Sequence, residues 1–163
     1  MIGQSAAVIA ERAGDVSGAD CAAWRALAAQ RPRILLVDED GVGRDHRFSG
    51  EKLSPVLALF TVTDFAAAVA LVERIYAYEG AGHSVGLNTT NDERALQLGL
   101  FLPVTRVIVN QAHSVATGGS FDNGLPFSLS MGCGTWGRNN FSDNMNFRHC
   151  LNIAGSVAIS AGW

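Results

Sequence analysis

A glycine-rich stretch that carries one thiol is the part of the chain best suited to chemistry. Residues 124–137 (GLPFSLSMGCGTWG) follow neither a helical nor a strand period, and Gly132, Gly134 and Gly137 surround Cys133. Glycines allow positive φ and let a ligand or another backbone approach closely. Nearby backbone N–H groups can activate a thiol as a nucleophile. The stretch therefore predicts a loop that lines a site, with Cys133 as one candidate nucleophile.

Two shorter segments carry groups that can bind a ligand or move a proton. Glu51 opens the segment EKLSP at residues 51–55, and its carboxylate either binds a ligand or lies solvated beside Lys52. His83 follows Gly-Ala-Gly at residues 80–82, where the imidazole either exchanges protons with a ligand or satisfies a helix C-terminus. Neither segment alone separates a functional role from a structural one.

Taken in order, these motifs resemble those of a known enzyme family. The segments at 51–55, 80–83 and 132–137, with Asn110 at the end of an apolar run, are similar to the C-terminal part of CoA-acylating aldehyde dehydrogenases. The likeness is to the sulfoacetaldehyde dehydrogenase type and runs from about Arg33 to Ile153. It implies the C-terminal portion of the catalytic domain of an enzyme that converts an aldehyde, CoA and NAD(P)+ into acyl-CoA and NAD(P)H.

The resemblance assigns roles to particular residues. It implies that Glu51 binds the ribose hydroxyls at the nicotinamide end of NAD or NADP, because a carboxylate accepts from both hydroxyls of a diol. Leu53 is then expected beside the nicotinamide, and His83 is an auxiliary group that orients the thioester or exchanges protons. The expected substrate pocket consists of His83, Asn110, Cys133, Thr135 and Trp136. The amide of Asn110 either positions the loop backbone or forms an Asx turn.

The family's acylated cysteine is expected to be missing from these residues. In the family it lies upstream of every motif found here, so Cys133 is a pocket-wall residue and no catalytic nucleophile is assigned. The nicotinamide-binding domain is expected to be absent too, because no strand followed by a glycine-rich helix start occurs in the chain. The isolated chain is therefore expected to show no turnover and to hold no cofactor tightly, with CoA as the co-substrate of the longer enzyme.

Two other functions are compatible with the same residues. The chain is alternatively a non-catalytic α/β module that forms oligomers, or a small-molecule binder whose glycine-rich loop takes CoA or a nucleotide. Family members bury a C-terminal strand in a partner subunit, so a homo-oligomer joined through this strand is expected.

Length, charge and cysteine usage exclude several classes of function. The 163 residues suffice for a single domain, 1–163, with a real core. A net charge of −3 without a basic block argues against a nucleic-acid partner, and no apolar run has membrane-spanning length. The three cysteines lack C-x-x-C spacing and the four histidines are scattered, so neither a disulfide framework nor a metal site is expected. A cytoplasmic protein is the default expectation.

These residues must be positioned by an alternation of strands and helices. Apolar runs predict buried strands at 33–37 and 55–62, and two further strands are predicted at 84–89 and 106–109. Helical patterns cover 5–13, 20–30, the stretch from Asp64 to Gly80, and 93–102. The order predicts an α/β fold in which helices cover both faces of a largely parallel sheet, a three-layer arrangement like the catalytic domain of the family. A long loop to about residue 146 is expected to be functional or ordered by a partner, and residues 150–153 predict a short final strand.

Overall fold

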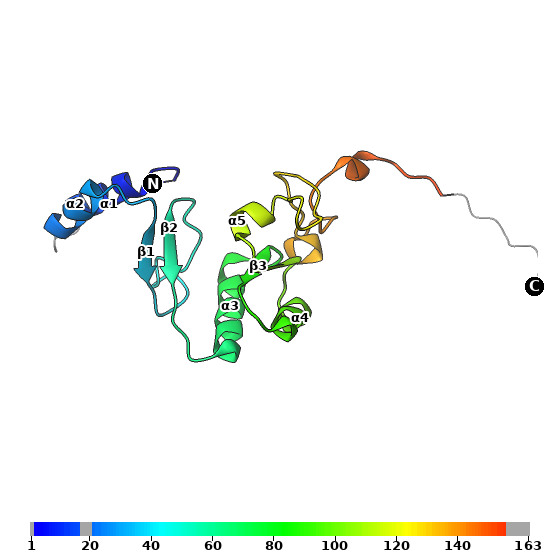
Figure 1. The fold of residues 1–163 in the computed structure, drawn as a ribbon, viewed down its shortest axis with the longest axis horizontal. Coiled ribbons are helices and arrows are strands. Elements are labelled where there is room, and N and C mark those ends of the chain that lie inside the picture. The colour runs from blue at the N-terminus through cyan, green and yellow to red at the C-terminus, as the bar shows by residue number, and fades with distance from the viewer. Residues whose placement is uncertain (1, 17–20, 156–163) are drawn as a thin grey trace, which may run out of the picture. The chain divides into compact units, whose positions relative to one another are not determined.

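The structure, a computed structural model, describes residues 2–16 and 21–155 (Figure 1). The chain divides into two compact units, Met1–Gly80 and Ala81–Trp163. Each unit contains one pair of parallel strands together with helices. The expected α/β class with parallel strands is thus confirmed, and the strands pair two by two. No helix within the described residues combines the length and the apolar character needed to cross a membrane.

The first unit contains three helices and a strand pair, and its first two helices precede the strands. Helices α1 (Ala6–Val16) and α2 (Cys21–Ala29) contact each other and precede β1 (Leu35–Asp38) and β2 (Val56–Leu59). The strands run parallel, with Leu35 beside Val56. The buried core of this unit consists of Ala6, Ile9, Ala10, Leu35 and Val56. Residue 20, expected as the start of the second helix, lies outside the described residues.

Only one face of this strand pair is buried, which corrects the expectation of fully buried strands. Leu36 and Leu57 are paired neighbours on the opposite face, and they are 64% and 52% exposed. Successive side chains of a strand point to opposite faces, so one cover from α1 and α2 protects only alternate residues. The apolar run therefore predicts strand formation correctly, but not burial on both sides.

Helix α3 (Phe65–Glu79) begins and ends as the sequence predicts. The Asp64 carboxylate accepts a hydrogen bond from the Ala67 backbone N at 2.9 Å, which caps the first turn and lowers the pKa of Asp64. Gly80 follows the last turn with φ of 114°, a conformation that L side chains rarely adopt, and its N–H donates to the Tyr76 carbonyl. Both helix limits are therefore set locally.

The second unit begins with a β-α-β segment. Strand β3 (Ser84–Leu87) runs parallel to β4 (Arg106–Val109), and α4 (Asp92–Phe101) connects them and contacts β4. Asn91 caps α4 by accepting from the Glu93 backbone N at 3.0 Å. The register places Ser84 beside Arg106, so residues 22 positions apart become direct neighbours.

The long segment after β4 is ordered by contacts within its own unit. It contains α5 (His113–Ala116) and the two 3-10 turns η1 (Gly134–Gly137) and η2 (Phe147–Cys150). Residues 130–134 and 141–145 run antiparallel, joined by backbone hydrogen bonds such as Gly132 N to Asp143 O and Gly134 N to Phe141 O, each 2.9 Å long. The glycine-rich loop is thus one arm of an irregular hairpin.

The final strand expected at 150–153 is not formed. Cys150 ends η2, and Leu151–Ile153 have no strand partner within the described residues. A strand requires a second chain segment to accept and donate its backbone hydrogen bonds, and apolar composition alone does not supply one.

Candidate functional site

Two motifs that are far apart in the sequence meet at Gly82. A Cβ atom added to Gly82 would lie 2.8 Å from the Cys133 carbonyl oxygen and 2.8 Å from the Gly137 backbone nitrogen. Gly82 also has φ of 101°, and its N–H donates to the Pro103 carbonyl at 2.7 Å. Only glycine satisfies both this conformation and this close approach. The structure therefore brings the segment that ends at His83 against the loop around Cys133.

Thr105 and Arg106 hold this junction together, and neither role could be predicted from the sequence. The Thr105 hydroxyl lies 2.9 Å from the carbonyl oxygen of Gly82 and 3.0 Å from that of His83. The Arg106 Nη1 donates to the Thr105 hydroxyl at 3.0 Å and to the Gly132 carbonyl at 3.2 Å. These residues sit at the start of a strand outside any motif, so only the parallel pairing of β3 and β4 reveals their place.

A buried serine links two histidines. Ser84 Oγ lies 2.9 Å from His83 Nδ1 and 2.8 Å from His113 Nε2, and Ser84 is 9% exposed. His113 comes from α5 and lies over β3, where a Cβ atom on Gly86 would be 2.6 Å from its Nδ1. A hydroxyl has one proton, so when it donates to one imidazole it can only accept from the other. The arrangement couples the tautomer of exposed His83 to that of half-buried His113.

His113 is expected to titrate below the ordinary pKa of a histidine. Burial of the imidazole, and secondarily the nearby charge of His83, lowers the pKa of His113 from 6.5. A depressed folded-state pKa means that this contribution to stability is present above pH 6.5 and is lost as the pH falls through the folded-state pKa. NMR titration of the imidazole resonances should show that the pKa of His113 lies below 6.5.

The variant His83→Gln separates the two causes of the shift. It removes one charge but leaves the burial of His113, so the pKa of His113 should rise part of the way toward 6.5. A wild-type His113 that titrates at or above 6.5 would contradict the buried environment described here.

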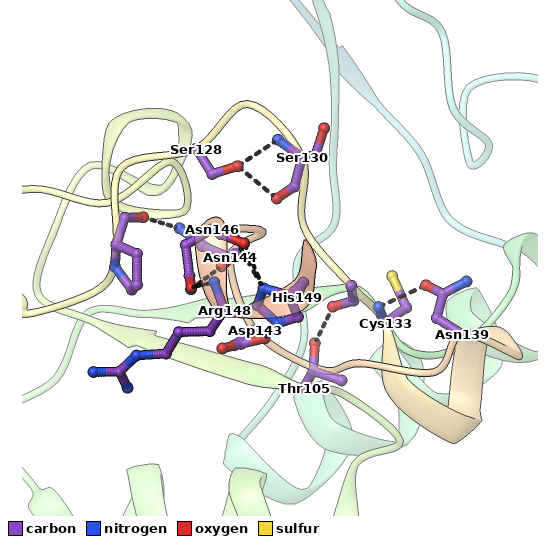
Figure 2. A network of polar contacts seen from close by, with 12 residues as sticks. Thr105, Ser128, Ser130, Cys133, Asn139, Asp143, Asn144, Asn146, Arg148 and His149 are labelled. Carbon is purple, nitrogen blue, oxygen red and sulfur yellow. Dashed lines mark hydrogen bonds and ion pairs between the residues drawn. The ribbon is translucent and has the colours of Figure 1, made fainter. Parts of the chain in front are cut away.

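The loop around Cys133 is fixed by hydrogen bonds to its backbone. Cys133 N donates to Asn139 Oδ1 at 2.8 Å, as Figure 2 shows, and Gly137 N donates to the Cys133 carbonyl at 3.1 Å. The Asn139 amide also donates to the Gly137 carbonyl at 3.2 Å. Cys133 is a half-buried free thiol. Its backbone N–H and carbonyl are therefore occupied in holding the turn together.

A pocket of about 410 Å³ lies beside this turn. Thr135 and Trp136, two of the residues expected to form a substrate pocket, line it, and Trp136 is 58% exposed. Its other lining residues are Val104, Thr105, Gly134, Asn139, Asn140, Phe141 and Ser142. His83, Asn110 and Cys133 are not among the lining residues, although Cys133 directly precedes η1.

Asn110 joins the loop after β3 to the end of β4. Its Oδ1 accepts from the Thr89 backbone N and its Nδ2 donates to the Thr89 carbonyl, both at 2.8 Å. Asn110 itself has φ of 53°, which asparagine tolerates better than most residues. The amide thus holds the backbone of Thr89 in the loop after β3, and not the long loop that follows Asn110.

A second polar network supports the far arm of the hairpin. Asn144 is completely buried, and its Nδ2 donates to the carbonyl oxygens of Thr117 at 2.9 Å and Pro126 at 2.8 Å. Asp143 Oδ1 lies 2.7 Å from His149 Nε2. Asn146 and His149 form a capping box at the start of η2. These contacts give the hairpin its shape without any regular sheet.

The expected cofactor residues lie in the first unit. The Glu51 side chain is exposed, and Lys52 Nζ donates to the carbonyl oxygens of Phe48 and Gly50, each at 2.6 Å. The Glu51 backbone N–H donates to Glu79 Oε2 at 3.1 Å, and the Glu51 carboxylate forms no ion pair among the described residues. Leu53 is 59% exposed with φ of 46°, a strained conformation of the kind that persists at ligand sites.

A carboxylate-histidine cluster organises the loop before Glu51. His46 Nδ1 lies 2.9 Å from Glu39 Oε1 and 3.3 Å from Asp40 Oδ1. The hydrogen bond from His46, with further ones from the Asp40 and Phe48 backbones, lowers the pKa of Glu39. The three side chains offer ligand atoms within 4.8 Å of one another, but the hydrogen bonds already account for their positions.

Comparison with known proteins supports the resemblance seen in the motifs. No protein-family model matches the chain. Over 151 residues the chain is 64% identical to the acylating sulfoacetaldehyde dehydrogenase of Cupriavidus necator, covering 93% of this chain and 29% of that protein. It is 38% identical over 153 residues to the sulfoacetaldehyde dehydrogenase of an Acholeplasma species, covering 94% of this chain and 29% of that protein. The chain thus spans less than a third of the length of these relatives.

Solved structures agree with the sequence comparison. The acetylating aldehyde dehydrogenase of Geobacillus thermoglucosidasius matches with a TM-score of 0.75 and 29% identity, covering 99% of this chain and 34% of that one. A probable aldehyde dehydrogenase of Listeria monocytogenes matches with a TM-score of 0.78 and 30% identity, covering 98% and 33% of the two chains. Motifs, sequence identity and fold together identify the chain as a homologue of one portion of the CoA-acylating aldehyde dehydrogenases.

Proposed function

We propose that the chain provides part of the substrate pocket and one cofactor contact of an acylating aldehyde dehydrogenase. The complete enzyme converts an aldehyde, CoA and NAD(P)+ into acyl-CoA and NAD(P)H, with sulfoacetaldehyde as the aldehyde. The observation that carries this proposal is the 64% identity over 151 residues to an acylating sulfoacetaldehyde dehydrogenase. The assembly of the His83 segment against the Cys133 loop supports it.

The residues described above have defined parts in this proposal. His83 is the exposed member of the two-histidine pair, and it exchanges protons with the substrate while Ser84 and His113 set its tautomer. Thr135 and Trp136 form the wall of the aldehyde pocket, and Cys133 supports that wall. Glu51 and Leu53 hold the ribose and nicotinamide of NAD(P), which accepts the hydride when bound.

We propose that the working enzyme is a cytoplasmic homo-oligomer. Leu151 and Ile153 are 56% and 80% exposed, and their backbone has no strand partner within the described residues. An extended apolar segment of this kind can pair with the sheet edge of another subunit. We therefore expect residues 151–153 to form a strand only when they pair with another subunit.

A chimeric enzyme tests the proposed function. In the Cupriavidus necator enzyme, the 151 matched residues are replaced by those of this chain, and NAD(P)+ reduction is measured with sulfoacetaldehyde and CoA. We expect an active chimera, whose kcat falls by about 10²-fold on His83→Gln because a proton-exchanging group is lost. The isolated chain, by contrast, should show no turnover.

Two controls make this result interpretable. His149→Gln removes a histidine of the same unit that contacts Asp143, Asn146 and the Phe141 ring but does not itself line the pocket beside Trp136. It should leave kcat within about twofold of the unsubstituted chimera. A chimera that assembles like its parent but shows no activity contradicts the proposal. Turnover by the isolated chain that Cys133→Ala abolishes would overturn the pocket-wall role of Cys133.

A further inference from the structure

Arg106 is a buried cation, and only one of its three guanidinium nitrogens forms hydrogen bonds among the described residues. The residue is 8% exposed, and its Nη1 donates to the Thr105 hydroxyl and the Gly132 carbonyl. Its Nε and Nη2 atoms are buried and have no hydrogen-bond partner among the described residues. No carboxylate of the described residues forms an ion pair with it either. A buried charge without a partner is unfavourable, so an anionic partner is expected.

The two unused nitrogen atoms lie on the same edge of the guanidinium group. Nε and Nη2 point their N–H bonds in parallel, and this edge binds two oxygens of a carboxylate, sulfonate or phosphate group at once. The bonds from Nη1 to Thr105 and Gly132 fix the plane of the group and therefore the direction of the free edge. The donor pair is preorganised by the fold.

Arg106 also lines a pocket of about 400 Å³ along β4. The other lining residues are Thr105, Val107, Ile108, Val109, Gln111, Asn123 and Leu125, and none of them carries a negative charge. Gln111 is exposed, which gives access from solvent, and its Oε1 accepts from Asn123 Nδ2 at 3.2 Å. This bond leaves the NH₂ group of Gln111 as a further donor at the pocket.

We propose that the Nε–Nη2 edge of Arg106 anchors an oxyanion-binding site in this pocket. The ligand is a small molecule, or a group of one, with two oxygens on one face: a sulfonate, carboxylate or phosphate. The two N–H groups bind it through parallel charge-assisted hydrogen bonds, and Gln111 adds a neutral donor. The site lies along β4 and shares only Thr105 with the lining of the pocket beside Trp136. The proposal does not depend on the proposed reaction.

NMR of the arginine Nε–H groups of the whole chain tests this proposal. The Arg106 resonance is assigned by its loss in Arg106→Lys, and it is then followed during titration with methanesulfonate, acetate or inorganic phosphate at constant ionic strength. We expect a saturable shift of this resonance, and the relative affinities of the three ions identify which oxyanion the site takes. Chloride, which offers no paired oxygens, should produce no saturable shift.

Two variants test whether the Nε–Nη2 edge of Arg106 is responsible for anion binding. Backbone amide shifts of Gln111 and Asn123 report binding in Arg106→Lys, where affinity should fall about tenfold or more because lysine keeps the charge but lacks the paired donors. Arg148→Met removes an exposed arginine of the same unit and should leave the affinity unchanged. Equal affinities in the wild type and Arg106→Lys would overturn the proposal. The proposal would also be overturned if the Arg106 Nε–H of the wild type were protected from hydrogen exchange without added anion and if its resonance did not shift when anion is added.

Discussion

A Gly82→Ala substitution is expected to lower the free energy of unfolding of the second unit by about 4 kcal/mol. The new Cβ would lie 2.8 Å from the Cys133 carbonyl oxygen and from the Gly137 nitrogen, both backbone atoms that no side-chain rotation can move away. The positive φ of 101° adds conformational strain for alanine. Relief of the overlap requires the His83 segment to separate from the Cys133 loop, so the proposed site should be lost together with stability.

Gly80→Ala is the matched control for this prediction. Gly80 also has a positive φ, 114°, but a Cβ atom there meets nothing within 4 Å. The difference between the two variants therefore measures the overlap alone, without the backbone strain. Native-state hydrogen exchange measures each variant in its own unit: the β3 and β4 amides report Gly82→Ala, and the α3 amides report Gly80→Ala. Equal losses in both variants would show that the close approach at Gly82 does not exist.

The second large effect is expected at Asn144, where alanine should cost about 3 kcal/mol. The side chain is completely buried, and its amide satisfies the carbonyl oxygens of Thr117 and Pro126. Alanine leaves both oxygens without these bonds and opens a cavity in their place. The lost stability comes from the contacts between the hairpin and the segment that follows α5.

Asn140→Ala provides the comparison for Asn144. Asn140 lies in the same hairpin but is exposed, so its truncation should change the free energy of unfolding by less than about 0.5 kcal/mol. Hydrogen exchange of residues 130–134 and 141–145 compares the two variants. If Asn144→Ala were as stable as Asn140→Ala, the buried bridge from Thr117 to Pro126 would be disproved.

The elements of the fold were largely predictable because each is specified by neighbouring residues. The β4 strand has the predicted bounds, 106–109, and α3 has the predicted cap, since both depend on side chains within a few positions. The expectation of strands buried on both faces was wrong for Leu36 and Leu57, because burial depends on what covers the sheet. Residues 150–153 form no strand within the described residues for the related reason that pairing requires a second segment.

The sequence by itself determined the family likeness, the order of strands and helices, and the three motifs around Glu51, His83 and Cys133. Only the tertiary structure revealed the contact of Ser84 with His113, 29 residues away, and the half-used guanidinium of Arg106. The reason is physical: propensity, periodicity and capping act over a few residues, whereas burial and hydrogen-bond partners are set by which distant segments the backbone brings together. A serine or an arginine in a strand therefore acquires its chemistry from its spatial neighbours.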